Sequence, residues 1–321
     1  MIKTRLENVA AKEDAAIVIE NIVAKKAKTS LEVAFENATK SLKSKVFNTL
    51  ENLTSISRKV AKVSTVGIFL LGTVSLFAQF SGGNGTAESP FEIRTRAELE
   101  NVSLFPDKHF VLKANIRDSL RTPLCYEYDN PFTGVFNGNG YKITLAMNEQ
   151  VYNVRVGLFA YVRDTAIIKN VVIDGYIKGE GIAASIVAHS QYNSNLQIIN
   201  CINMAKITGT STGGIISVIS DSNTIIKNCI NIGSIKSINL DAGGIVAQIN
   251  PVGFSLTVKS CINSGFIYGS SDSSTLMGCG TAGIAGHSYD KNGTISNCIN
   301  IGVITGITNE LKKVGGIVPI K

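Results

Sequence analysis

One arrangement of apolar and polar positions recurs five times between residues 167 and 306. The copies read IIKNVVIDGYIKG, QIINCINMAKITG, IIKNCINIGSIKS, TVKSCINSGFIYG and TISNCINIGVITG, and each centres on a Cys that is replaced by Val in the first copy. The positions three before and six after this centre are apolar in every copy, so we expect both to face a core. These positions are Ile168, Ile198, Ile226, Val258 and Ile295, and Ile177, Ile207, Ile235, Ile267 and Ile304.

A second, shorter element lies between the copies. It reads VGLFA at 156, ASIVA at 184, GGIIS at 213, GGIVA at 243, AGIAG at 282 and GGIVP at 315, at intervals of 28 to 39 residues. Periods of this length are typical of solenoids or propellers, in which each unit packs on its neighbours.

The apolar positions do not fit one straight strand. Side chains along a strand alternate with a period of two, whereas the inward Ile and the central Cys are three positions apart, so the chain must bend between them. Short strands separated by corners predict a mainly β fold, a parallel β-helix in the right-handed sense. Because adjacent coils lie about 4.8 Å apart, six coils would form a rod about 29 Å long.

The Cys column has three interpretations. It contains one Cys in each of four copies, 28, 32 and 37 residues apart: Cys201, Cys229, Cys261 and Cys298. Zinc sites need paired Cys or His at close spacing, which these copies lack, so we expect neither metal nor cofactor. Disulfides between stacked cysteines are an alternative in an exported protein. The Val in the first copy, Val171, favours an inert ladder of buried thiols.

Asparagines flank the Cys column on both sides. They are Asn170, Asn200, Asn228 and Asn297 before it, and Asn203, Asn231, Asn263 and Asn300 after it. Asn tolerates tight corners, and stacked amides can hydrogen-bond from coil to coil, so we expect structural ladders. A further column holds Gly175, Gly233, Gly265 and Gly302, where we expect a turn with positive φ.

Residues 1–62 follow a helical pattern instead. They contain no Gly or Pro, and apolar residues recur every three or four positions between Leu31 and Val60. This spacing predicts a helical, basic leader, which either binds a partner or is a solvated helix.

Residues 63–80 are typical of a signal peptide or signal anchor. Arg58, Lys59 and Lys62 precede a short apolar core, and Ala78 precedes Gln79. The core is shorter than the roughly 20 residues of a membrane span, and a buried core helix is the alternative. On the export interpretation everything after residue 80 lies outside, secreted or at the cell surface, and only 63–80 contacts a membrane. Residues 81–150 are then the capping segment of the β-helix, and 151–321 are its repeats.

The charge distribution argues against a nucleic-acid partner. The net charge is +7, but residues 1–78 alone hold 12 Lys and Arg against 7 Asp and Glu. The remaining chain, with 19 basic and 17 acidic residues, is close to neutral and offers no basic stripe.

Candidate catalytic residues do not converge. A polysaccharide-cleaving site needs carboxylates, or an Arg and Lys set, on one face. His189 and His287 share a column about 14 Å apart, and we expect both to be surface corner residues. The acidic residues of the repeats fall in different columns: Asp174, Asp221, Asp241, Asp272 and Asp290.

The longest insertion, residues 268–281, is the candidate binding loop, because loops on rigid scaffolds often carry binding. A variable insertion without a role is the alternative. A host or matrix protein or a glycan would be its partner. Although the chain has no Trp, several tyrosines could stack on a sugar ring. They are Tyr126, Tyr128, Tyr192, Tyr268 and Tyr289.

The repeats resemble the GLUG-type repeat of bacterial surface proteins. VGLFAYVRDTAIIKNVVIDGYIKG at 156–179 carries the resemblance most clearly, and GGNGTAESPFEIRTRAELENV at 82–102 and FTGVFNGNGYKITL at 132–145 resemble the segment that precedes such repeats. The resemblance covers about residues 82–321 and implies an adhesin-like or other cell-surface protein. Such repeats also accompany IgA-cleaving metallopeptidases, but the H-E-x-x-H motif of those enzymes does not occur in this sequence.

These observations predict an exported, surface-exposed β-helical module with a structural or adhesive role and no enzymatic activity. The alternative is a polysaccharide-active β-helix enzyme, of the lyase or hydrolase kind.

Overall fold

The computed structural model describes residues 79–250, 255–270, 280–288, 293–306 and 313–318. The expected leader at 1–62, residues 63–78 of the expected signal segment and most of the 268–281 loop lie outside these residues. The chain from Ala78 onward forms one compact unit. Among the described residues, no helix has the length and apolar character needed to cross a membrane.

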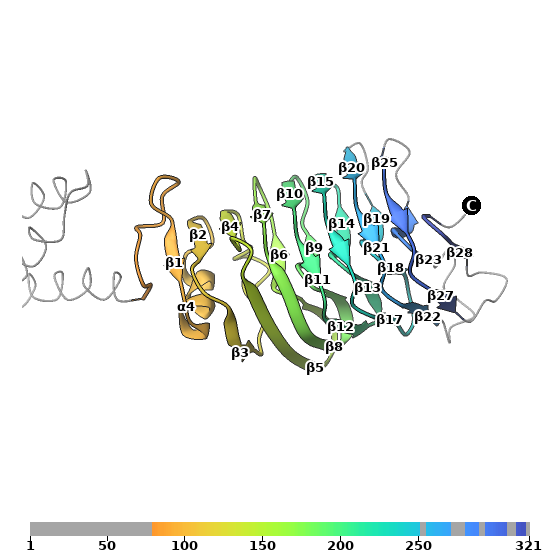
Figure 1. Cartoon of the computed structure of the whole chain (residues 1–321), viewed down its shortest axis with the longest axis horizontal. Coiled ribbons are helices and arrows are strands. Elements are labelled where there is room, and N and C mark those ends of the chain that lie inside the picture. The colour runs from red at the N-terminus through yellow and green to blue at the C-terminus, as the bar shows by residue number, and fades with distance from the viewer. Residues whose placement is uncertain (1–78, 251–254, 271–279, 289–292, 307–312, 319–321) are drawn as a thin grey trace, which may run out of the picture. The chain divides into compact units, whose positions relative to one another are not determined.

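The unit is a parallel β-solenoid of about six turns, as the repeats predict (Figure 1). The strands form three sheets, here named A, B and C, and all the strand pairs within these sheets are parallel. Neighbouring strands in a sheet therefore come from successive coils, so a repeat in the sequence becomes a column in the structure.

Sheets A and C contain one strand from each coil that they cross. In spatial order, sheet A contains β1 (Phe91–Ile93), β2 (His109–Leu112), β4 (Val135–Asn137), β7 (Ile167–Lys169), β10 (Asn195–Ile199), β15 (Asn223–Lys227), β20 (Leu256–Lys259) and β25 (Thr294–Ser296). Sheet C contains β6 (Phe159–Val162), β9 (Val187–Ser190), β14 (Ile216–Ser220), β19 (Val246–Asn250) and β24 (Ala285–Ser288).

Sheet B begins with β3 (Ile116–Leu120), followed by two long strands, β5 (Lys142–Val156) and β8 (Val172–Ala184), and continues with short strands. Later coils divide the same path into three short strands: β11 (Ile202–Asn203), β12 (Lys206–Gly209) and β13 (Ser211–Gly213), β16 (Ile230–Asn231), β17 (Ile235–Ser237) and β18 (Ala242–Gly243), β21 (Ile262–Asn263), β22 (Ile267–Gly269) and β23 (Gly280–Ala282), and β26 (Ile299–Asn300), β27 (Ile304–Gly306) and β28 (Lys313–Gly315).

The two apolar columns of the repeat line the core, as predicted. Ile198 pairs with Ile168 on one side and Ile226 on the other, and the second column keeps the same register. The members of both columns are at most 1% exposed, except Ile295 and Ile304 of the last coil, which pack partly buried against the core.

The predicted bend lies one residue before each Cys position. The five residues there adopt left-handed backbone conformations, with φ between 53° and 57°: Asn170, Asn200, Asn228, Ser260 and Asn297. Asn is the residue that tolerates this region best after Gly. The corner ends sheet A and begins sheet B, which allows both the Ile before it and the Cys after it to face inward.

Aromatic rings close the core at the first coil. Phe80 stacks on Phe91 with ring centroids 4.4 Å apart, and Phe105 and Phe110 pack around them. The adjoining helices are α4 (Arg96–Glu100) and η1 (Asn101–Leu104), and Thr95 and Glu98 form a capping box at the start of α4. Sheet A runs without interruption from β1 to β25, so the segment before the repeats and the repeats share one sheet.

The corner at Ser260 predicts a stabilising substitution. Ser260→Asn should raise the thermal unfolding midpoint, because Asn populates positive φ more readily than Ser. The free energy of unfolding should rise by up to about 1 kcal/mol. Ser260→Val should lower the midpoint, because a β-branched residue is strained at positive φ. Ser264→Asn, at an exposed position without positive φ, is the control and should change stability by less than about 0.5 kcal/mol. If the Ser260→Val protein were as stable as the parent, the left-handed backbone conformation of residue 260 would be contradicted.

Candidate functional site

The four repeat cysteines stack along the core as free thiols. At each step the N–H that follows a Cys donates to the carbonyl of the Cys in the preceding coil at 2.9 Å. Each Sγ lies 3.3–3.8 Å from two carbonyl oxygens, one of its own strand and one of the preceding coil, to which its S–H can donate. Cys201, Cys229 and Cys261 are fully buried, whereas Cys298 in the last coil is partly exposed.

Burial opposes ionisation of two thiols of the column. It raises the pKa of the Cys229 thiol, with contributions from Cys201 and Cys261 beside it, and it also raises the pKa of Cys298. The pKa of Cys261 is lowered instead, chiefly by the hydrogen bond between its side chain and that of Cys229. Cys125, outside the column, is free and buried, and desolvation raises its pKa to about 12. The thiolate is the nucleophile and the metal ligand, so a raised pKa suppresses both kinds of chemistry. Among the residues that the structure describes, no group of three or more His, Cys, Asp or Glu could hold a metal ion.

The asparagines after the Cys column form a buried chain of amide hydrogen bonds. Nδ2 of Asn203, Asn231 and Asn263 donates to Oδ1 of the next Asn at 2.6–2.7 Å, ending at Asn300. Each Nδ2 also lies 3.2–3.4 Å from the carbonyl two residues further along its own chain. The first three amides are 0% exposed. Because both hydrogens of each of them have partners, this inner amide ladder can lie beside apolar side chains without a large desolvation penalty.

The glycine column makes room for the inner amide ladder, and the prediction of positive φ is wrong for three of its four members. Only Gly175 has a positive φ, at 95°. A Cβ on Gly233, Gly265 or Gly302 would lie 2.0–2.1 Å from a carbonyl oxygen of the preceding coil and 2.7–2.8 Å from an Asn Nδ2. Close approach of the coils therefore selects Gly. The second repeat element contributes three more glycines to this packing, Gly214, Gly244 and Gly283. A Cβ on any of them would lie 2.3–2.9 Å from the Cγ atom of a ladder Asn.

The asparagines at the corner form a second, outer amide ladder. Asn228 donates from Nδ2 to Oδ1 of Asn200 at 3.1 Å, and Asn200 donates to Asn170 at 3.0 Å. In the next coil the corner residue is Ser260, which interrupts the amides before Asn297. The outer ladder donates toward the start of the chain, whereas the inner one donates toward its end.

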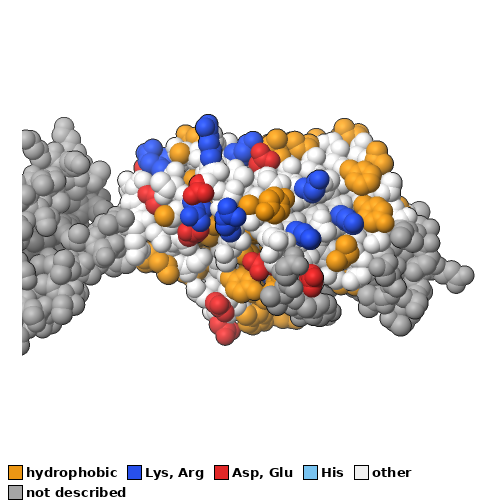
Figure 2. Space-filling model, turned by 90° about the horizontal axis from the view of Figure 1, so that it is seen from below, with side chains coloured by type: hydrophobic (Ala, Val, Ile, Leu, Met, Phe, Trp, Pro, Cys, Tyr) orange, Lys and Arg blue, Asp and Glu red, His pale blue; other side chains and the backbone are white. Residues whose placement is uncertain are grey.

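The outer face of sheet B displays the exposed side chains of the repeat. Exposed apolar residues include Ile232 at 47%, Phe266 at 46% and Ile301 at 73%. Basic residues lie among them, and Lys236 lies over the ring of Tyr268 at 5.6 Å. Seen from below in Figure 2, the solenoid surface shows Lys and Arg side chains with hydrophobic side chains between and beyond them.

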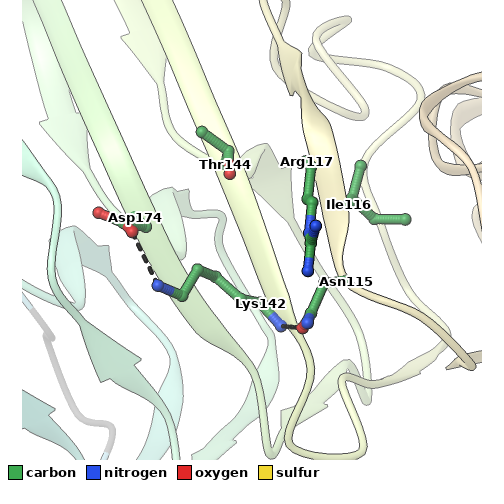
Figure 3. A pocket seen from close by; sticks show the side chains of 6 residues that line it. All are labelled: Asn115, Ile116, Arg117, Lys142, Thr144 and Asp174. Atoms are coloured by element: carbon green, nitrogen blue, oxygen red, sulfur yellow. Dashed lines mark hydrogen bonds and ion pairs between the residues drawn. The ribbon is translucent and has the colours of Figure 1, made fainter.

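A depression of about 290 Å³ lies on this face near its start. It is lined by Asn115, Arg117, Lys142, Thr144 and Asp174, from β3, β5 and β8, together with Ile116 (Figure 3). The ammonium group of Lys142 bonds to Asp174 at 2.9 Å, and this hydrogen bond lowers the pKa of the Asp174 carboxyl. Of the two cations in the lining, Lys142 is already paired with the carboxylate of Asp174.

Sequence reasoning missed most of this depression. Asp174 was a candidate, but its neighbours Lys142 and Thr144 come from a coil that lacks the Cys-centred motif. Only the pairing of Thr144 with Asp174 and of Ile116 with Ile143 brings these residues together. An alignment of this coil onto the repeat would have been needed to find them.

The two repeat histidines share a column, as predicted, but they lie in strands. The column runs from Tyr161 through His189, Val218 and Gln248 to His287. His189 is 8% exposed, so its prediction as a surface corner residue is wrong, and burial, together with the nearby Arg155, lowers its pKa to about 4. The imidazole lies 5.9 Å from the ring of Tyr161 and bonds through Nε2 to Oγ of Ser220 at 2.9 Å.

The acidic residues of the repeats stay apart where they are described. Asp174 pairs with Lys142, and Asp221 lies in a turn with a φ of 36°. Asp241 accepts a hydrogen bond from the backbone of Gly280 at 2.7 Å and lies 3.5 Å from Nδ1 of His287. The candidates Asp272, Tyr289 and Asp290 lie outside the described residues.

Two known proteins share parts of this sequence, and no family model matches it. Over 121 residues, or 34% of the chain, it is 33% identical to a protein from Evansella cellulosilytica that is provisionally named a Gly-rich membrane protein. Over 141 residues, or 37% of the chain, it is 27% identical to halomucin from Haloquadratum walsbyi. The matches cover only 14% and 2% of these two relatives.

A solved structure shares the fold. It is a crystal structure from Bacteroides ovatus, provisionally named an immunoglobulin A1 protease. The two structures match with a TM-score of 0.51 and 17% sequence identity, over 75% of this chain and 87% of the other. At this identity the likeness shows the fold alone.

Close packing around the inner amide ladder predicts that one added methyl group lowers the free energy of unfolding substantially. Gly265→Ala should destabilise the protein by about 1–3 kcal/mol or more, because the new Cβ would overlap a carbonyl and an amide of the preceding coil. Gly316→Ala is the matched control, because nothing lies within 4 Å of its Cβ position. Urea unfolding followed by circular dichroism measures both, and equal midpoints would contradict the close approach of the coils.

Burial of the Cys column predicts that the fold tolerates Val at these positions and does not tolerate a charged side chain. Cys229→Val should change stability by less than about 1.5 kcal/mol, because Val171 fills the same column in the first copy. Cys229→Asp should unfold the solenoid, because it buries an unpaired carboxylate. A thiol-reactive dye should label Cys229 only after denaturation, as read by mass spectrometry. Isolation of a Cys201–Cys229 disulfide from the native protein would overturn this picture.

Proposed function

We propose that the chain is an exported, surface-exposed β-helical module with a structural or adhesive role and no enzymatic activity. The observation that carries the proposal is the regularity of the outer surface. Hydrogen bonds along the whole solenoid fix the backbone, so each coil displays its outward side chains in register with the next. Such a scaffold suits display of a surface better than concentration of catalytic groups.

The character of the outer face of sheet B supports an adhesive role. Large contiguous apolar areas are rare on soluble monomers and mark interaction sites. Here exposed residues such as Ile232 and Phe266 lie among lysines. Because the region after residue 78 is close to neutral, specific contacts rather than long-range attraction would select its partner.

The relatives support a location at the cell surface. One carries a membrane-protein name, and the other is named halomucin. We assign the repeats to the GLUG type on the motif at 156–179, and this assignment agrees with such a location. The membrane would be contacted only through residues 63–80, and nucleic acid is not a partner.

Residues 268–281 remain our candidate for contact with a host or matrix protein or a glycan. Tyr268, at the start of this segment, is held on sheet B beside Lys236.

A polysaccharide-active enzyme is the second candidate. The contact of His287 with Asp241 favours it, since an imidazole beside a carboxylate is a common acid–base arrangement. However, the side chains are only 12% and 5% exposed, which leaves little room for a substrate.

Fractionation of cells that produce the full chain tests the proposal. We expect the protein outside the cytoplasm, either with an N-terminus near Gln79 after cleavage or with an intact N-terminus in the membrane fraction. N-terminal sequencing distinguishes a secreted rod from an anchored one. A full-length, soluble cytoplasmic product would contradict export and, with it, the adhesive role.

A further inference from the structure

A cluster of aromatic and polar side chains lies on the outer side of sheet C, near its first strand. The ring of Tyr161 in β6 meets Tyr128 edge-on at 5.5 Å and the imidazole of His189 at 5.9 Å. The guanidinium group of Arg155 lies 5.9 Å from the centre of the Tyr161 ring. The column to which these rings belong is separate from the core, because Val218 in the same column packs outside the core cluster that contains Ile219.

The segment that carries Tyr128 is fixed at both ends to β6. The N–H of Leu124 donates to the carbonyl of Leu158, and the N–H of Phe132 donates to the carbonyl of Tyr161, at 2.8 and 3.0 Å. Nε2 of Gln191 also donates to the carbonyl of Tyr128 at 2.7 Å. These contacts hold the ring of Tyr128 in place while 49% of the residue is exposed.

Two buried polar atoms beside these rings have no hydrogen-bond partner. They are Nδ1 of His189 and Oε1 of Gln191, in residues that are 8% and 2% exposed. Nε2 of the same His189 already bonds to Ser220 at 2.9 Å. Unsatisfied buried groups are costly and uncommon in folded proteins, so a ligand hydroxyl that reached these two atoms, which the free chain closes off from solvent, would recover that cost.

We propose that Tyr128, Tyr161, His189 and Gln191 form a binding subsite for an uncharged saccharide chain that runs along sheet C. Sugar hydroxyls both donate and accept, which suits an amide oxygen and an imidazole nitrogen at once. Tyrosine rings supply the flat apolar surface on which the C–H face of a sugar stacks. This inference names a ligand class for the adhesive module proposed above and rests on that proposal only for its biological role.

The charges around the subsite favour an uncharged ligand. The lowered pKa of His189 keeps the imidazole neutral at physiological pH. Arg155 places a cation beside the rings, whereas Glu149 and Glu127 place negative charge near Tyr126, whose pKa they raise after the larger effect of burial. An acidic saccharide would meet these carboxylates.

The spacing of the column also fits a polysaccharide. Tyr161, His189, Val218 and Gln248 follow one another at the step between coils. This step is about 4.8 Å, close to the length of one sugar residue in an extended chain. A saccharide chain parallel to the solenoid axis would therefore place each of its sugars beside one residue of this column.

The test measures binding of neutral oligosaccharides by the purified full-length chain. The probes are tetramers of glucose, mannose, galactose and N-acetylglucosamine in β1–4 linkage, with a galacturonate tetramer as the acidic comparison. Because the chain has no Trp, its intrinsic fluorescence comes from tyrosine and reports directly on ring contacts. We expect at least one neutral tetramer to bind with a saturable change in this fluorescence and the galacturonate tetramer to bind at least tenfold more weakly.

Matched variants locate the site. Tyr128→Ala should weaken binding at least tenfold, and Tyr128→Phe should retain most of it, because the ring is kept. Tyr176→Ala is the control: Tyr176 is 46% exposed, similar to Tyr128, but lies on sheet B. Thermal unfolding of each variant shows whether the fold is intact, and saturation-transfer NMR with Gln191→Leu provides a second readout of the buried contact.

Three results would overturn the inference. They are failure of every neutral tetramer to bind, preference for the galacturonate tetramer, and equal loss of binding in Tyr128→Ala and Tyr176→Ala. The outcome is separable from the proposed function, because purified protein can bind a sugar whether or not cells export it. A cytoplasmic protein that binds through Tyr128 would refute export and retain the subsite.

Discussion

The separation between successive coils is the constraint on which the rest of the solenoid depends. Backbone hydrogen bonds fix this separation near 4.8 Å, and every column must fill that space with side chains that stack on copies of themselves. The inner amide ladder meets the constraint because an Asn amide donates along the stack and accepts from it in the same plane. Glycines on both sides leave room for the amides, since a Cβ on Gly233 or Gly214 would lie within 2.9 Å of a ladder atom. The Cys column solves the same problem with a small side chain that packs against carbonyl groups.

The repeat predicted the parts of the fold that this constraint controls. Apolar columns, the bend before the Cys and the stacking of Asn could be read from the sequence because each depends on a few neighbouring positions. The reason for Gly265 could not be read from the sequence. A side chain is excluded there by a carbonyl group of the previous coil and not by the φ of the residue itself. The burial of His189 was equally hidden, because a residue on the outer side of a strand is covered by segments remote in sequence. The depression around Lys142 lies in a coil without the motif, where no column could be assigned.

The two candidate binding regions lie on different sheets and differ in character. Sheet B offers a broad outer face with exposed apolar and basic side chains, of which Phe266 and Lys236 are examples. Sheet C offers a narrow column with rings and recessed polar atoms around Tyr161. A flat, partly apolar face suits a protein partner, whereas rings beside uncharged polar groups suit a sugar. One rigid solenoid could therefore hold two unlike partners at once, without coupling between them.

The opposite directions of the two amide ladders have an electrostatic consequence. Amides aligned head to tail add their dipoles, as peptide groups do in an α-helix, and a single ladder would build a field that grows with each coil. In this solenoid the inner row, beginning at Asn203, points its donors one way, and the outer row, ending at Asn228, points them the other way. Where both rows are present their axial dipoles oppose each other. A coil that carries both rows, such as that of Asn200 and Asn203, therefore adds little net axial dipole to the rod, whereas the coil of Ser260 carries the inner row alone.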